Sequence, residues 1–242
     1  MHTTTHHLVR RTSVAIAVSF ALAGLTAVIS PAAAAPSEDR ILAVEAHTSD
    51  KARGLAQTYS KHLRQLNASV YHCMPWVEVH KQSIGFFKPK HATSDERYLS
   101  IRLFVEQDTS PQFAALAVEE RASSMFSRYV GPMLRRMATH GPFLTDPTVD
   151  GFTVIVEWLK QAPRNGGQAV NETIAVFVDR KTAAEYVGKA IASRALASRA
   201  RVLAFDGETA LGAVRLTAWD DDFVTTHKVK NYQLAPGVTC QP

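Results

Sequence analysis

The chain has 242 residues, of which 46% are hydrophobic and 20% charged, and it carries a formal net charge of +5. This balance is typical of a folded globular protein and excludes a disordered or collagen-like chain. The positive charge is small and dispersed along the sequence, so we expect no nucleic-acid partner.

The first residues have the pattern of a secretory signal peptide. Arg10 and Arg11 precede an uncharged apolar run over 14–29, and an alanine-rich segment follows it. We expect cleavage between Ala34 and Ala35. This pattern predicts a signal peptide over 1–34 and a single globular domain over 35–242.

An uncleaved N-terminal anchor is the alternative, although the apolar run is shorter than the roughly 20 residues that a membrane span needs. The residues after the arginine pair, Thr12 to Val14, do not fit a twin-arginine signal, and the first cysteine is too distant for a lipoprotein. We therefore expect an exported protein, periplasmic or extracellular, that is not a lipoprotein. The mature chain has no predicted transmembrane segment and a net charge of about +3.

The sequence holds two cysteines, Cys73 and Cys240. Two cysteines in an exported protein usually pair, so we predict a disulfide between them, with two free thiols as the alternative. Such a bridge would tie the C-terminal tail to the end of the first long helix.

Helical spacing of apolar residues predicts a helix from a cap at Ser49 or Asp50 to about Ser69, after a shorter helix over 37–46. Pro75 ends the helical structure. An extended segment begins near Val77.

A polar loop over 89–96 separates this segment from an alternating strand over 97–107, and the two strands are predicted to form a hairpin. A long helix follows from about Pro111, with a kink or break at Gly131-Pro132. Methionines along one face of this helix indicate core packing rather than a ligand groove.

The second half of the chain predicts strands over 152–159 and 173–179, a helix over 182–200 and further strands over 202–205, 212–219 and 224–229. The predicted fold is α+β, with a mostly antiparallel sheet of five to seven strands covered by helices, plus the N-terminal helix.

The two halves resemble each other as β-β-α units over about 79–138 and 152–200. At the strand-to-helix junctions, Thr109 with Gln112 and Thr182 with Glu185 match the capping-box pattern. Capping boxes are common after strands, so an internal duplication and a coincidence both remain open.

The sequence lacks the common catalytic signatures, among them G-x-S-x-G, H-E-x-x-H and the phosphate-binding loop. We expect no cofactor and no metal. His72 and Cys73, with His80 and His91, could form a thiol or zinc site, but their spacing favours surface histidines and a structural cysteine. Two acidic clusters, Asp206-Gly207-Glu208 and Asp220-Asp221-Asp222, favour solvated turns over a calcium site.

A basic segment has cations beside aromatic residues. Such a segment could contact an anionic polymer or a membrane surface, whereas a hairpin tip with buried aromatics is the simpler interpretation. Its members are His80, Lys81, Phe86, Phe87, Lys88, Lys90 and His91.

These patterns favour an exported, non-catalytic binding or envelope-associated protein, whose ligand or envelope partner the sequence does not identify. If the two halves are a true duplication, the cleft between them is the expected ligand site. The alternative is an exported hydrolase with a dispersed carboxylate or histidine site. Its candidate acids are Glu106, Glu157 and Asp179, which lie near predicted strand ends.

Overall fold

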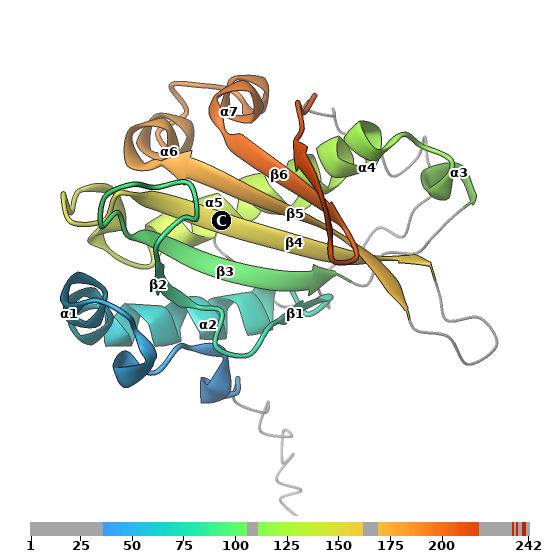
Figure 1. Cartoon of the computed structure of the whole chain (residues 1–242). Helices are drawn as coiled ribbons and strands as arrows, with labels where there is room; N and C mark the ends of the chain where they lie inside the picture. The colour runs from blue at the N-terminus through green and yellow to red at the C-terminus, as the bar shows by residue number, and fades with distance from the viewer. Residues whose placement is uncertain are drawn as a thin grey trace, which may run out of the picture. The chain divides into compact units, whose positions relative to one another are not determined.

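The computed structural model describes residues 36–105, 111–161 and 169–217, together with residues 234, 236, 239 and 240. A mixed sheet of seven strands lies at its centre, in the order β1-β3-β4-β5-β6-β7, with β2 also paired to β3 (Figure 1). The strands are β1 (Val77–Val79), β2 (Gly85–Phe87), β3 (Tyr98–Val105), β4 (Gly151–Gln161), β5 (Val170–Asp179), β6 (Arg201–Asp206) and β7 (Thr209–Ala213).

Strand direction in the sheet is mostly antiparallel, as expected. Only β3 and β4 run parallel, and β1 and β2 share the other edge of β3. Parallel neighbours need a long crossover connection, which the helices between β3 and β4 provide. The α+β prediction is confirmed.

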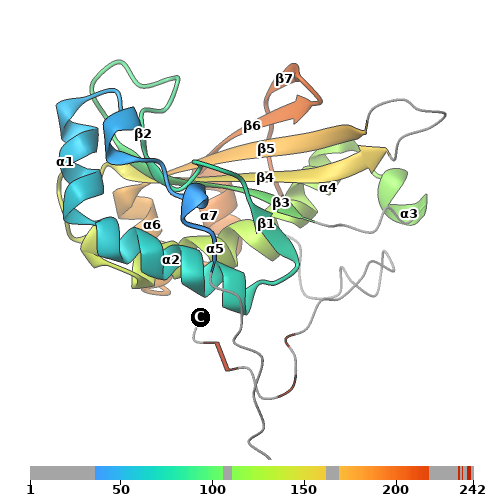
Figure 2. The ribbon, with the colours of Figure 1, turned by 90° about the horizontal axis from the view of Figure 1, so that it is seen from below.

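The helices are α1 (Asp50–Thr58), α2 (Ser60–Cys73), α3 (Pro111–Ala114), α4 (Val118–Met125), α5 (Gly131–Thr139), α6 (Arg180–Val187) and α7 (Ser193–Arg199). Short 3-10 turns occur at η1 (Glu38–Arg40), η2 (Val44–Ala46) and η4 (Pro142–Leu144), and a π-helical turn at η3 (Phe126–Val130). Figure 2 shows α2, α5, α6 and α7 together on one side of the sheet.

The face of the sheet that meets the helices is apolar. Alternation places every second side chain of a strand on this face. The side chains that β3 and β4 contribute are almost completely buried: Leu99, Ile101, Leu103, Val105, Phe152, Val154, Val156 and Trp158. They form the core as predicted.

The N-terminal helix begins where the sequence predicts. The Ser49 hydroxyl accepts a hydrogen bond from the Ala52 amide at 3.2 Å, which caps α1. A change of backbone direction at Tyr59 divides the helix into α1 and α2, and α2 ends at Cys73, shortly before Pro75. The shorter helix expected over 37–46 is instead two separate 3-10 turns.

The helix expected from Pro111 is interrupted near its start and not at Gly131-Pro132. The chain leaves helical structure after α3, over 115–117, whereas α4 continues through η3 directly into α5. Pro132 lacks an N–H group and its ring needs space near the carbonyl one turn earlier. The wider π-helical turn just before Gly131-Pro132 provides that space, so the helix passes the proline without ending.

The methionines of this helix pack in the core, as predicted. Met125, Met133 and Met137 are completely buried.

The predicted capping box at Thr182 is wrong. Helix α6 begins at Arg180, and the Asp179 carboxylate accepts hydrogen bonds from the Thr182 amide at 2.9 Å and the Thr182 hydroxyl at 2.7 Å. Asp179 ends β5 and therefore reaches the free amide groups at the start of the helix. Glu185 forms an ion pair with Arg199 of α7 instead.

Other boundaries in the second half also differ. The helix predicted over 182–200 is two helices, α6 and α7, and the strand predicted over 212–219 is β7, which ends at Ala213. The strand predicted over 224–229 lies outside the described residues.

The internal duplication stays a prediction. Both halves contain strands followed by helices, but the segment aligned with β4 consists of two short strands, β1 and β2, with a turn between them. Of the first junction, Thr109 lies outside the described residues, whereas Gln112 is in α3.

The disulfide between Cys73 and Cys240 is present, with 5.7 Å between the two Cα atoms. It joins the last residue of α2 to the C-terminal end of the chain, as predicted.

Gly151, the first residue of β4, lies where the sheet leaves no room for a side chain. A Cβ atom at this position would lie 2.5 Å from the Val178 carbonyl oxygen and 2.6 Å from the Tyr98 ring. Backbone of the neighbouring strand cannot move without disturbing the β4–β5 pairing.

The substitution Gly151→Ala should therefore lower the free energy of unfolding by about 1–3 kcal/mol, as overpacking does. Gly54→Ala is the matched control, because no atom lies within 4 Å of its Cβ position in α1. Alanine there should raise stability by about 0.5–1 kcal/mol through its helix propensity. Urea unfolding of the two variants measures both effects; equal effects would contradict the steric argument.

Candidate functional site

No helix of the described residues covers the second face of the sheet, and this face carries the candidate site. Figure 1 shows β3 to β6 in front of α5, with the loop that connects β2 and β3 on the viewer's side. The strand register places the side chains of this open face in rows that cross the sheet. One row holds Ser100, Thr153, Phe177 and Arg201; the next holds Arg102, Ile155, Ala175 and Leu203; the third holds Glu157, Thr173 and Phe205.

A cavity of about 610 Å³ lies over these rows. Its walls come from the loop between β1 and β2, which contributes His80 to Ser83, and from the segment Phe87–Lys90 after β2. The volume is within the range of small-molecule sites, about 300–1,000 Å³. We call it the open-face cavity.

The floor of the open-face cavity is apolar over β4, β5 and β6. Its side chains are half-buried apart from one buried alanine, although none of the helices from α1 to α7 covers them. They are Ile155, Ala175, Phe177, Leu203 and Phe205. Hydroxyl groups of Ser100, Thr153 and Thr173 lie among them. Apolar surface with a few polar groups is the usual composition of a ligand site.

A polar cluster around Glu157 borders this floor. Arg102 donates two hydrogen bonds to Glu157 Oε2, from Nε at 3.2 Å and from Nη2 at 2.6 Å. Asn171 Nδ2 donates to the other carboxylate oxygen at 2.7 Å. His80 Nε2 lies 3.3 Å from Oε2, at an angle that does not make a hydrogen bond.

These neighbours keep Glu157 ionised. Contact with His80, together with the Arg102 guanidinium and the Asn171 amide, holds the pKa of Glu157 at about 2, against the opposing effect of burial. A carboxylate with this pKa and with partners on both oxygens cannot donate a proton at neutral pH. Glu157 therefore positions Arg102 and His80 rather than acting as a general acid.

The structure places two of the three candidate acids, Glu157 and Asp179, apart from each other. Glu157 lies mid-strand on the open face, whereas Asp179 caps α6, and Glu106 lies outside the described residues. The described residues that line the open-face cavity include no aspartate or glutamate.

Cys73 is a structural cysteine, which is the interpretation that the sequence favoured over a thiol or zinc site. Cys73 is in the disulfide, and the described residues contain no cluster of histidine, cysteine or acidic side chains that could hold a metal ion. His91 packs edge-on against the Phe177 ring, with centroids 5.0 Å apart. Burial, and then the charge of Arg201, lower the pKa of His91.

The basic segment around the β2 strand divides between core and cavity. Phe86 is buried in the core, whereas Phe87 lines the open-face cavity with His80, Lys81, Lys88 and Lys90. Successive strand residues point to opposite faces, so only one of the two aromatics could have been buried under the helices. The prediction of a tip with buried aromatics is therefore correct for Phe86 alone.

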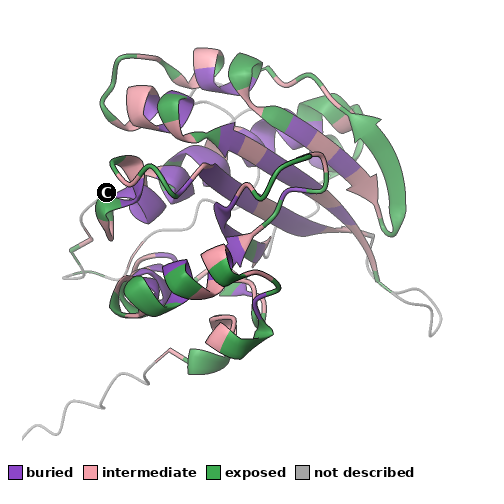
Figure 3. Ribbon diagram, turned by 60° about the vertical axis from the view of Figure 1, so that its left-hand side comes forward, coloured by how far each residue is buried: buried purple, intermediate pink, exposed green. Residues whose placement is uncertain are grey.

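The acidic turn Asp206-Gly207-Glu208 joins β6 to β7, and the Gly207 φ of 59° suits a tight hairpin turn. Asp206 pairs with Lys160 at 2.6 Å. The other acidic cluster, Asp220-Asp221-Asp222, lies outside the described residues. Strand β7 is exposed along its whole length; Figure 3 colours such residues green.

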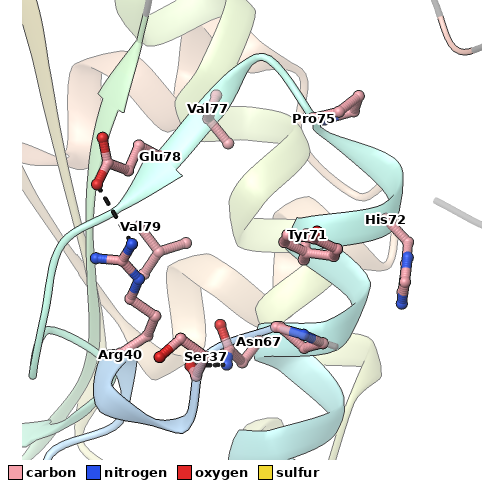
Figure 4. A pocket seen from close by; sticks show the side chains of 10 residues that line it. Ser37, Arg40, Asn67, Tyr71, His72, Pro75, Val77, Glu78 and Val79 are labelled. Carbon is pink, nitrogen blue, oxygen red and sulfur yellow. Dashed lines mark hydrogen bonds and ion pairs between the residues drawn. The ribbon is translucent and has the colours of Figure 1, made fainter. Parts of the chain in front are cut away.

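A second cavity, of about 600 Å³, lies between the start of the described chain, the end of α2 and β1 (Figure 4). Its polar groups are already engaged: Arg40 pairs with Glu78 at 3.3 Å, and Asn67 donates to the Ser37 carbonyl at 2.9 Å. Figure 4 shows His72 across the cavity from this ion pair. Few groups are left here to recognise a ligand.

One buried ion pair was not predicted from the sequence. Arg121 of α4 binds the Glu172 carboxylate of β5 on the helical face, and Trp158 Nε1 donates to Glu172 Oε2 at 3.1 Å. It fastens α4 to the far end of the sheet. The sequence signal for this ion pair was an acidic residue, Glu172, at a position of an alternating strand that faces the core.

Comparison with known proteins gives no match, since no family model, curated protein or solved structure is significantly similar to this chain. Within the described residues, no helix is both long enough and apolar enough to cross a membrane.

The low pKa of Glu157 gives a pH-dependent prediction. Because the folded pKa, about 2, lies below the ordinary value of 4.5, ionised Glu157 stabilises the fold above pH 4.5, and this stabilisation is lost as the pH falls towards 2. Glu157→Gln should lower the free energy of unfolding at pH 7 by about 1–2 kcal/mol, less than for a fully buried pair because Arg102 is half-exposed.

Denaturant unfolding at pH 7 and pH 3 measures this effect, and the gap between Glu157→Gln and the wild type should narrow at pH 3. Glu78→Gln is the control, since Glu78 is exposed and also pairs with an arginine; it should change stability by less than about 0.5 kcal/mol. A gap that stays constant between the two pH values would contradict the assignment.

Proposed function

We propose that this protein is an exported, non-catalytic binding protein whose ligand occupies the open-face cavity. The observation that carries the proposal is the half-buried apolar floor on the side of the sheet without helices. Apolar side chains left partly exposed in a concave surface, with a few polar groups around them, favour ligand binding.

The chemistry of the cavity favours binding over hydrolysis. Its described lining supplies cations and hydroxyl groups, and Glu157, which contacts the lining residue Arg102, is ionised and fully engaged by its neighbours. The Ser83 hydroxyl donates to the His80 backbone carbonyl at 2.8 Å, so it is not held by a base as a nucleophile would be. A dispersed carboxylate hydrolase would need a second acid at this site.

Export is supported by the signal-peptide pattern together with the Cys73–Cys240 disulfide. Disulfides persist outside the reducing cytosol, and this one closes a loop of 167 residues. In the chain-entropy model, a loop of that length stabilises the fold by up to about 5 kcal/mol.

The export proposal predicts the form of the purified protein. When the full chain is expressed in a bacterium and recovered from the periplasm or medium, N-terminal sequencing should give Ala35, and mass spectrometry should find Cys73 and Cys240 oxidised. Ala34→Phe should block processing, because the peptidase accepts small residues there. An intact leader with two free thiols would contradict the proposal.

The binding proposal predicts saturable uptake of an apolar probe. N-phenyl-1-naphthylamine, which is uncharged at neutral pH, should increase in fluorescence on binding the wild-type protein. Ala175→Phe should weaken this binding at least about tenfold, because the larger ring fills the centre of the cavity floor.

Ala190→Phe is the matched control, since Ala190 is exposed in the connection between α6 and α7. It should bind the probe like the wild type. Circular dichroism checks that both variants fold. Absence of saturable binding to the wild type, or equal binding by both variants, would refute a ligand site on this face.

A further inference from the structure

The open-face cavity has two chemically different sides. Over β4 to β6 its floor is apolar, whereas over β3 the loops from β1 and β2 bring cationic side chains to its wall. The basic side chains are His80, Lys81, Lys88 and Lys90 from these segments and Arg102 from β3 itself. A ligand that contacts both sides therefore needs an apolar part and a polar part.

Two of the lysines have no acidic partner within the part of the chain that the structure describes. Arg102 is paired with Glu157 and Lys81 with Asp39, at 3.2 Å. Lys88 and Lys90 are exposed, and no carboxylate of the described residues lies within ion-pair distance of either ammonium group. Both ammonium groups remain available to a ligand at the cavity rim.

Further positive charge lies at the opposite end of the same surface. Arg201, which the register places beside Phe177, is exposed and forms no ion pair with the described residues. Its charge acts on His91, whose ring covers one edge of Phe177. The surroundings of the apolar floor are thus cationic on two sides.

We propose that the ligand is an amphiphilic anion, with its apolar body on Ile155, Ala175 and Leu203 and its carboxylate or phosphate group at Lys88 and Lys90. This inference rests on the proposed function and adds the chemical class of the ligand. Ammonium groups attract either anionic group as point charges, without the bidentate geometry of arginine. Hydroxyl groups of Ser100 and Thr153 lie on the floor between the two parts and can hydrogen-bond to the ligand.

The same features disfavour other ligands. A cationic ligand would find no acid among the described residues that line the cavity, and a neutral one would leave the two lysines unused. A nucleic acid needs a row of cations that follows many phosphates. The rim of this cavity offers only two lysines that have no acidic partner among the described residues, and an apolar floor lies beside them.

The test compares molecules that share a twelve-carbon chain and differ in the head group. Dodecanoate, dodecyl phosphate, methyl dodecanoate and dodecyltrimethylammonium each compete with bound N-phenyl-1-naphthylamine, below their micellar concentrations. Both anions should displace the probe at concentrations about five- to tenfold lower than the ester, and the cation should be weakest. A difference between the two anions would identify the preferred head group. The preference should decrease at high salt.

The variant Lys88→Glu/Lys90→Glu should lose the preference for anions while it still binds the uncharged probe. Lys61→Glu/Lys181→Glu is the matched control, with the same change in net charge on exposed lysines of α2 and α6. This control should keep the preference. It separates local recognition by the rim lysines from a general effect of net charge.

The outcomes distinguish the two proposals. If the ester competes as well as the anions, and the Lys88→Glu/Lys90→Glu variant behaves like the wild type, the head-group inference is wrong while the binding function stands. If the control loses the preference as well, the recognition is not at Lys88 and Lys90, and the inference is again wrong. If the uncharged probe does not bind at all, the binding function itself is refuted.

Discussion

The parallel pairing of β3 with β4 is the constraint on which the rest of the structure depends. Antiparallel neighbours can be joined by a tight turn. Parallel neighbours instead require a long connection that returns the chain to the end of the sheet where the first strand began. The segment between Val105 and Gly151 makes this crossing as α3, α4, η3 and α5. Since the crossover lies on one face, the apolar side chains of β3 and β4 on that face become the core.

The opposite face follows from this arrangement. Strand alternation gives every strand a second set of side chains. None of the described helices lies over those of β3 to β6. What partly covers them comes from the edge of the sheet: the turn between β1 and β2 and the loop after β2. Because these short segments carry lysines and Phe87, the open face becomes a cavity with an apolar floor and a cationic wall.

Each face of the sheet has an ion pair that involves a strand glutamate. The pair on the helical face is buried, and the pair on the open face is half-buried. Glu172 of β5 anchors α4 on the helical face through Arg121, and Glu157 of β4 anchors Arg102 and His80 on the open face. The two acids lie on adjacent strands with their side chains on opposite sides of the sheet. Each is stable as a charge because its oxygens accept hydrogen bonds from more than one donor.

The sequence by itself determined the local elements and the covalent link. Alternation marked β3 and β4 and their buried faces, Ser49 marked the start of α1, and the two cysteines marked the disulfide, because each of these depends on neighbouring residues or on simple pairing. Local signals failed where two nearby residues could both cap a helix. At α6 the cap is Asp179 and not Thr182.

Only the tertiary structure decided the candidate site. The residues of the cavity floor come from three strands, and they meet through strand register, which links positions as distant as Ile155 and Leu203. The same register placed Glu157 beside Arg102 and Asp179 at a helix cap, so these two candidate acids are not together. Sequence periodicity tells which side chains share a face of one strand, but the choice of neighbouring strands, and therefore of the site, is made by long-range packing.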